Sequence, residues 1–407
     1  MSWTMVIQKE VGDSQMSKYN VTAFQEGNPS AISTEFNISR TEIINDFQKL
    51  LPAISGIRFR SLKLESCDSD YLIKSIKDRI RLSFSDDFRA VIDSADTLHF
   101  ITDDVKVPWE LTGLEDNLKQ RYSFGISQLS KRKFAGTKIE ESHTLNILFV
   151  VDTKDNLPQT RGETQKIISM IDRINEKDSM QVNYTILEGK DATYSNVRRN
   201  LIQQYFDIIH IATHTEYNGI ILNDGLLKPS DIYHDIKIGA PWLVFMNSCE
   251  SAAGIDIDPF EKYGELSNLT IAFLAGGALS YIGTNCIIND EVAAEISVGL
   301  YSDLFKGLTM GESLRNSKNS FANLHQGNLG GLAFRLFGDP MIKRNFGVDS
   351  ISSDIVKDDR LESNETINLK VRVLEYIQKN KGEFNISKCA RDLNSDVYDI
   401  MNIVSEL

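Results

Sequence analysis

Four short apolar runs decide the fold: NILFVV at residues 146–151, VNYTIL at 182–187, DIIHIAT at 207–213 and WLVFMN at 242–247. Each run is rich in β-branched and aromatic residues, which favour strands. Helical patterns from Glu163 to Ile174 and from Tyr194 to Tyr205 lie between the first three runs. This alternation predicts an α/β fold with a mostly parallel sheet covered by helices on both faces, and such a sheet carries its chemistry at the carboxyl ends of its strands.

Hydrophobic periodicity predicts further elements on both sides of this region. They are edge strands within 1–45, helices at 42–54 and 70–91, a strand at 98–102, a helix and a strand within 264–283, helices at 290–305 and 311–324, and a strand at 333–337. The pattern of the last 41 residues resembles a winged helix. We therefore expect four parts, with boundaries at 1–140, 141–345, 346–366 (a polar linker) and 367–407.

Composition excludes several classes of protein. The formal charge of -13 argues against general binding to nucleic acid, because that binding depends on an excess of Lys and Arg. From Glu365 to Leu407 the chain carries seven acidic against six basic residues, so we expect the winged-helix-like segment to dock a protein, either a regulator or another copy of the chain, and a purely structural cap is the alternative. The N-terminal segment lacks the pattern of a signal peptide and no run is long enough to span a bilayer, which predicts a cytoplasmic protein without membrane contact.

A histidine and a cysteine follow two of the four apolar runs. The run DIIHIAT leads to His214, and WLVFMN leads to Cys249. Neighbouring parallel strands would bring both side chains to one edge of the sheet, where the imidazole can take the thiol proton. A helix that starts after Cys249 would lower the thiol pKa further. The alternative is that each is an ordinary packed residue.

Other chemistries lack their sequence signals. The chain contains no HExxH, no GxxxxGK[ST], no GxGxxG after a strand and no GxSxG. The four cysteines, Cys67, Cys249, Cys286 and Cys389, form no CxxC pair, so neither disulfides nor a zinc finger is expected. A metal site of His210, His214 and Cys249 would lack a fourth ligand. We expect neither metal nor cofactor.

Six segments resemble the CHAT-type peptidases, prokaryotic relatives of caspases and separases. They are LHFITDDVKVPWEL (98–111), DIIHIATHT (207–215), LVFMNSCESAAG (243–254), GELSNLTIAFLAGGALSYIGTNCIINDEVA (264–293), YSDLFKGLTMGESLRNSK (301–318) and LFGDP (336–340). The resemblance implies a caspase-like α/β sandwich with a degenerate first half, which holds Pro108, Trp109 and Glu110, and a working second half.

The resemblance also implies roles for residues of the site. His214 would act as general base and then acid, and Cys249 as the nucleophile that forms an acyl-enzyme. The backbone amides of Cys249 and Thr215 would hold the oxyanion. The family usually has glycine at the position of Thr215, so this residue is a departure that puts the loop conformation in question.

Substrate preference stays open at this stage. By resemblance, Asn247 would line the pocket for the residue before the scissile bond. Arg161 could favour an acidic side chain there, or be a solvated arginine. Asp256 and Asp258 would instead favour a basic side chain.

Two further residues are expected to support the site. His210 is predicted to be a hydrogen-bonded supporting residue on the strand that leads to His214. Glu250 would steady either the catalytic pair or the start of the following helix.

The leading hypothesis is therefore a cysteine endopeptidase that cleaves one or a few protein partners. Because relatives occur in prokaryotic defence and cell-death modules, including antiviral defence, the resemblance points to a pore-forming or toxin-like substrate. The alternative is a catalytically silent scaffold or signalling module with the same fold.

Overall fold

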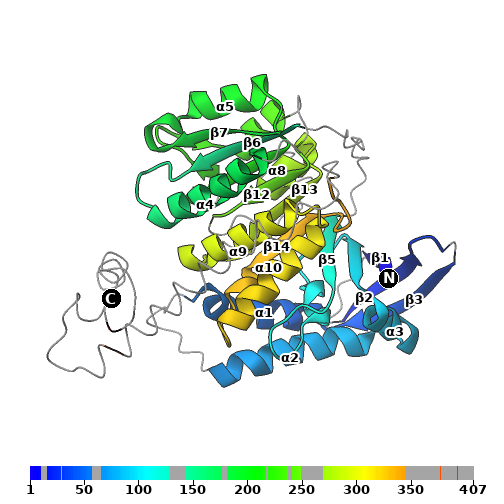
Figure 1. The fold of residues 1–407 in the computed structure, drawn as a ribbon. Helices are drawn as coiled ribbons and strands as arrows, with labels where there is room; N and C mark the ends of the chain where they lie inside the picture. Colours follow the sequence, from blue (N-terminus) through cyan, green and yellow to red (C-terminus); the bar gives the residue numbers. More distant parts are fainter. Residues whose placement is uncertain are drawn as a thin grey trace. The chain divides into compact units, whose positions relative to one another are not determined.

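The computed structural model describes residues 1–10, 16–28, 30–56, 66–128, 144–176, 181–216, 219–236, 241–248 and 269–344, together with Tyr376 and Asp392. The chain divides into two compact units, Met1–Asp349 and Ser350–Leu407. All elements named below belong to the first unit (Figure 1). In the second unit, the Tyr376 hydroxyl donates a hydrogen bond to Asp392 Oδ2 at 2.7 Å. The rest of the predicted linker and winged-helix-like module lies outside the described residues.

One large sheet runs through the described part of the first unit, with its eleven strands in the order β3-β2-β1-β4-β5-β14-β13-β12-β8-β6-β7. Three very short strands form a second sheet beside it, in the order β11-β10-β9. The bounds of the strands are β1 Ser2–Lys9, β2 Ser17–Gln25, β3 Ala31–Ile38, β4 Thr97–Thr102, β5 Ser123–Gln128, β6 Thr144–Val151, β7 Gln181–Glu188, β8 Ile208–Ala212, β9 Thr215–Glu216, β10 Gly219–Ile221, β11 Leu226–Leu227, β12 Leu243–Met246, β13 Ser280–Thr284 and β14 Phe334–Gly338.

The large sheet consists of two blocks of opposite direction. Strands β7, β6, β8, β12 and β13 are parallel to one another. Strand β14 is antiparallel to β13 but parallel to β5, which continues in parallel to β4 and β1. An antiparallel meander of β2 and β3 completes that side. The prediction of a mostly parallel sheet is confirmed, and the carboxyl ends of β6, β8, β12 and β13 share one edge.

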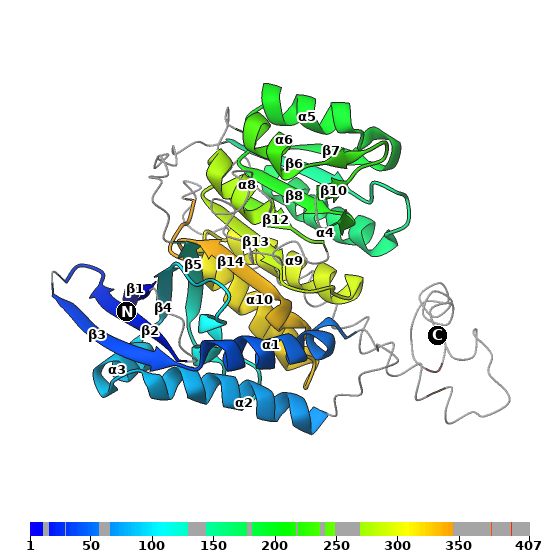
Figure 2. The same ribbon diagram turned by 180° about the vertical axis from the view of Figure 1, so that it is seen from behind.

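Helices cover both faces of the sheet. Helices α4, α9 and α10 pack side by side on one face of the second half, and α5, α6 and α8 lie on the other face (Figures 1 and 2). The bounds of the helices are α1 Arg40–Ser55, α2 Ser66–Ser83, α3 Asp86–Ser94, α4 Pro158–Asn175, α5 Tyr194–Gln203, α6 Pro229–Asp235, α8 Leu269–Gly276, α9 Asp290–Leu304 and α10 Met310–Leu324, with short 3-10 helices at Trp109–Gly113, Gly189–Asp191 and Gly330–Ala333.

The prediction of a single helix at 70–91 is wrong. The segment forms two helices, α2 and α3, and the chain is extended at Ser85 between them, with φ -62° and ψ 164°. Serine followed by two aspartates is a common start of a helix, because these residues favour the N-cap and the first turn. Phe84, between the two helices, is buried. Strand β5, helix α6 and the small sheet were not predicted.

A buried ion pair joins a segment from the first half of the chain to a strand from the second half. Glu110 lies in the 3-10 helix Trp109–Gly113, and Arg335 lies on β14. Arg335 Nε lies 2.8 Å from Glu110 Oε1, and Arg335 Nη2 donates to Glu110 Oε2 at 3.0 Å. Both residues are about 5% exposed. The segment that holds Trp109 and Glu110 in the first half of the chain is therefore bonded to β14 of the second half.

Candidate active site

Strands β8 and β12 set the position of the predicted catalytic pair. They are parallel neighbours, and their register pairs Ile211 with Met246. His214 follows the first of these residues by three positions, and Cys249 follows the second by three positions. The prediction that two neighbouring parallel strands lead to these residues is confirmed. Cys249 itself lies outside the described residues, so its contact with His214 stays a prediction.

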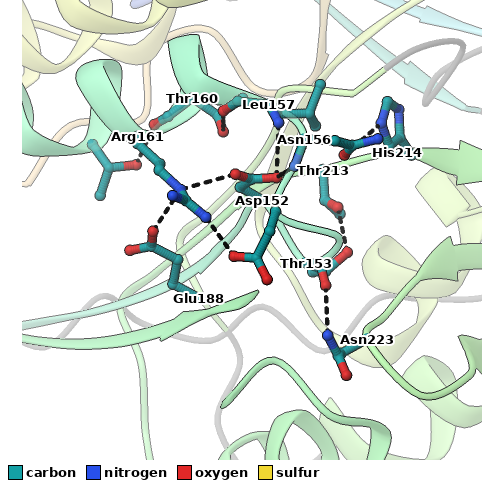
Figure 3. A network of polar contacts seen from close by, with 12 residues as sticks. Asp152, Thr153, Asn156, Leu157, Thr160, Arg161, Glu188, Thr213, His214 and Asn223 are labelled. Atoms are coloured by element: carbon teal, nitrogen blue, oxygen red, sulfur yellow. Dashed lines mark hydrogen bonds and ion pairs between the residues drawn. The ribbon is translucent and has the colours of Figure 1, made fainter. Parts of the chain in front are cut away.

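Among the described residues, one side chain lies within hydrogen-bond distance of the His214 imidazole. His214 Nε2 lies 3.2 Å from Oδ1 of Asn156, which belongs to the loop between β6 and α4 (Figure 3). The carbonyl oxygen of His214 accepts a hydrogen bond from the amide of Ile221 at 3.0 Å. Thr215 starts β9 and pairs with Ile220. The assignment of the Thr215 amide to the oxyanion site stays a prediction.

Arg161 lies on the first turn of α4 and not in the preceding loop, because the helix starts at Pro158. Its guanidinium contacts three carboxylates: Nε lies 2.9 Å from Asp152 Oδ2 and 2.7 Å from Glu188 Oε1, and Nη2 lies 2.5 Å from Asp155 Oδ1 (Figure 3). The suggested role in binding an acidic side chain stays a prediction. The guanidinium of Arg161 already forms ion pairs with these three carboxylates.

A buried polar cluster lies beneath the carboxyl edge of the sheet. Glu163 from α4 accepts a hydrogen bond from Asn247 Nδ2 at 2.7 Å, and its other oxygen lies 3.3 Å from His210 Nε2. His210 Nδ1 lies 3.1 Å from the Tyr301 hydroxyl of α9. All four residues are less than 5% exposed. The cluster ties α4, which follows Asn156, to α9 and to the strands that lead to His214 and Cys249.

The two polar atoms of the Asn247 side chain have different surroundings. Its amide nitrogen faces Glu163, whereas its Oδ1 has no hydrogen-bond partner among the described residues. The hydroxyl of Ser248 is likewise buried without a partner there. Both groups belong to the two residues that directly precede Cys249 in the sequence. The predicted role of Asn247 in lining the substrate pocket is not tested by these contacts.

Comparison with known proteins places the chain in a family. The family model described as "CHAT domain" matches residues 93–360, which is more than half of the chain. The chain belongs to the CHAT domain family. Among proteins with curated functions, no sequence matches it.

Two solved structures resemble this CHAT chain in fold. The separase of the Saccharomyces cerevisiae separase–securin complex matches with a TM-score of 0.54 and 10% identity, over 84% of this chain and 30% of the separase chain. The Arg-specific cysteine proteinase gingipain R matches with a TM-score of 0.50 and 10% identity, over 74% of this chain and 76% of the gingipain chain. The chain therefore has the caspase-like fold of these cysteine peptidases, and it spans about 30% of the separase chain.

Asp290 interacts electrostatically with His214, which the sequence did not reveal. It is the first residue of α9, which follows the carboxyl end of β13. Burial is the main reason that the pKa of Asp290 is raised, and the charge of His214 acts in the opposite direction. The carboxylates of Glu163 and Asp152 raise it further. Asp290 thus lies within electrostatic reach of His214, although it is distant from His214 in the sequence and belongs to no catalytic motif.

Several predicted site residues cannot be placed. Glu250, Asp256 and Asp258 lie outside the described residues of the CHAT domain. The same holds for the side chain of Cys67 and for Cys389. Cys286 is buried, with 5% of its surface exposed.

The described residues contain neither a metal-binding cluster nor a membrane-spanning helix. No group of three or more His, Cys, Asp or Glu side chains there is arranged to hold a metal ion. In the same part of the chain, no helix combines the length and the apolar character needed to cross a membrane.

Proposed function

We propose that this CHAT domain is a cysteine endopeptidase in which Cys249 is the nucleophile and His214 is its base. The observation that carries this proposal is the register of β8 and β12, which pairs Ile211 with Met246 and so gives His214 and Cys249 the same offset at one sheet edge. Membership of the CHAT family and the caspase-like peptidase fold support the same chemistry.

The proposed reaction proceeds through an acyl-enzyme. His214 takes the proton of the Cys249 thiol, and the thiolate attacks the carbonyl carbon of the scissile peptide bond. The C–N bond breaks as His214 gives that proton to the departing amine. A water molecule, deprotonated by His214, then attacks the thioester and releases the acid product with the Cys249 thiolate as leaving group. No metal or redox partner is needed to balance these steps.

We further propose that the residue before the scissile bond is basic. Asp290 is half-buried, and its carboxyl lies within electrostatic reach of His214. The guanidinium of Arg161 is already paired with three carboxylates. A neighbour in fold, gingipain R, is described as Arg-specific. A Lys or Arg side chain would compensate the charge of Asp290.

The proposed substrate is one or a few specific proteins of a prokaryotic defence or cell-death system, and a pore-forming or toxin-like protein is the candidate to test first. A protein regulator that docks on the C-terminal module is also proposed. The separase neighbour was solved as a complex with securin, which is an example of a protein partner for a related fold.

The alternative is a silent scaffold with the same fold. It is favoured by Thr215, which occupies a position where CHAT peptidases usually have glycine. Labelling with iodoacetamide separates the two functions. Selective modification of Cys249 that is lost in His214→Ala supports the enzyme, and equal labelling of all exposed thiols supports the scaffold.

The deciding experiment uses the full chain, proteins encoded beside it and fluorogenic peptides. The peptides carry Arg, Lys or Asp before the scissile bond. We expect cleavage by the wild type, preference for Arg or Lys, and loss of cleavage in Cys249→Ala and His214→Ala. Equal cleavage by wild type and Cys249→Ala would refute the proposed function, and preference for Asp would refute the assignment of Asp290.

A further inference from the structure

The partner of the His214 ring defines which of its nitrogens carries hydrogen. Oδ1 of Asn156, 3.2 Å from His214 Nε2, can only accept a hydrogen bond. The hydrogen therefore resides on Nε2, and the lone pair of the neutral ring resides on Nδ1. This leaves Nδ1 as the atom that can receive the thiol proton.

We propose that Asn156 is a positioning residue that orients His214 and fixes its Nε2–H tautomer, so that Nδ1 is the ring atom able to accept the thiol proton. The effect of this orientation on catalysis rests on the proposed peptidase function. Asn156 touches neither Cys249 nor the scissile bond in this proposal. It acts through the imidazole, as the third group does in Cys-His-Asn arrangements on unrelated folds.

The backbone of Asn156 is held by an aspartate of the same loop. Asp152 Oδ1 accepts hydrogen bonds from the amides of Asn156 at 2.7 Å and Leu157 at 2.9 Å. Asp152 and Asp155 have left-handed backbone conformations, with φ of 40° and 57°. Such conformations cost non-glycine residues roughly 1 kcal/mol or more each, so they persist only where surrounding contacts hold them. The loop is therefore fixed in one shape before substrate binds.

A second set of contacts fastens this loop to the strand that leads to His214. The amide of Asp152 donates to the carbonyl oxygen of Ala212 at 2.9 Å. The hydroxyl of Thr153 lies 2.7 Å from that of Thr213, the residue just before His214 (Figure 3). It also lies 2.7 Å from the carbonyl oxygen of Ile221. The loop that holds Asn156 is therefore hydrogen-bonded to the segment that holds His214. These bonds lie before His214 in the sequence, at Ala212 and Thr213, and after it, at Ile221.

Arg161 holds the loop between β6 and α4 through ion pairs. Its contacts with Asp152 and Asp155 hold the two left-handed residues, and its contact with Glu188 anchors them to the end of β7. Gly189 lets this approach occur, because a Cβ atom there would lie 2.5 Å from Asp155 Oδ1. Arg161 therefore has a function in shaping the site that needs no contact with substrate.

The test compares Asn156→Ala and Asn156→Asp with wild type. Asn156 is exposed, so neither change should affect folding. We expect Asn156→Ala to lower kcat about 10- to 100-fold with KM nearly unchanged, as for other residues that orient a catalytic group. Asn156→Asp should retain more activity than Asn156→Ala, and its acid limb should move to higher pH because a carboxylate favours the imidazolium. Gln159→Ala, an exposed change on the first turn of α4, is the control.

An NMR titration makes the test independent of cleavage. The ring resonances of His214, assigned with His214→Ala, should titrate at a midpoint about one pH unit higher in Asn156→Asp than in wild type. An unmoved midpoint would overturn the contact. If wild type cleaves no substrate, the peptidase proposal fails while this titration still decides whether Asn156 holds the ring. If wild type cleaves and Asn156→Ala matches it within twofold in kcat, the positioning role is overturned.

Arg161→Ala separates positioning from substrate selection. If Arg161 shapes the loop, kcat should fall for all peptides by a similar factor. If it binds an acidic substrate side chain instead, the loss should be confined to peptides with Asp before the scissile bond, and that result would overturn the role given to Arg161 here.

Discussion

Lys318 allows a quantitative prediction about the junction of the two halves. It lies on α10 and is 5% exposed. Its ammonium donates to the carbonyl oxygen of Phe334 on β14 at 3.1 Å and lies 5.2 Å from the ring centre of Phe124 on β5. Burial is the main reason that the pKa of Lys318 is lowered from 10.5 to about 8, and the charge of Arg335 lowers it too. Glu110 opposes the shift.

The sign of the pH dependence follows from proton binding. Between about pH 8 and 10.5 the unfolded chain keeps the Lys318 proton while the folded chain has lost it, so this group makes the fold more stable as pH rises. The full shift corresponds to about 3 kcal/mol, and the part between pH 7 and 9.5 to about 2 kcal/mol. Lys318→Met removes this term. Wild type should therefore gain about 2 kcal/mol relative to Lys318→Met over that interval.

Urea unfolding at pH 7 and 9.5, followed by tryptophan fluorescence, measures the difference. All three tryptophans, Trp3, Trp109 and Trp242, belong to the first unit, so the signal reports on that unit. Lys74→Met, an exposed change on α2, is the matched control and should show no such pH dependence. A pH dependence that is the same in wild type and Lys318→Met would refute the reasoning, because it would mean that Lys318 titrates alike in both states.

Three further predictions concern buried or half-buried charges. Glu163→Ala should lower the free energy of unfolding by about 3 kcal/mol, because the amide of Asn247 loses its acceptor; a change under about 0.5 kcal/mol in urea unfolding would contradict this. Arg344→Ala should cost about 3 kcal/mol because it leaves the buried Asp207 carboxylate without its cation, and a double variant with Asp207→Ala should recover part of the loss. Asp290→Asn should lower kcat/KM at least about 10-fold for peptides with Arg or Lys before the scissile bond, and an unchanged ratio to Asp peptides would count against its role.

Local patterns in the sequence were sufficient for the second half of the sheet. The apolar runs became β6, β7, β8 and β12, because each has enough β-branched and aromatic residues to fill a buried strand. The break at Phe84 was missed because the helical periodicity continues across it. Strand β5 and the short strands near His214 were missed because their stability comes from pairing with distant segments and not from their own composition.

The candidate site divides in the same way. The sequence alone pointed to His214 and Cys249, because both follow apolar runs that can only be buried strands. It could not point to Asn156 or Asp290, which are ordinary polar residues in the sequence and gain their meaning from proximity to His214.

The sequence by itself determined the class of fold, the family resemblance and the two residues proposed for the chemistry, since these depend on residue type and spacing along the chain. Only the tertiary structure decided that β8 and β12 are adjacent in matching register, and that a loop with two left-handed residues brings Asn156 to the imidazole. The physical reason is that strand pairing, charge compensation around Arg161 and the direction of a hydrogen bond arise between segments far apart in the chain, where local propensity carries no information.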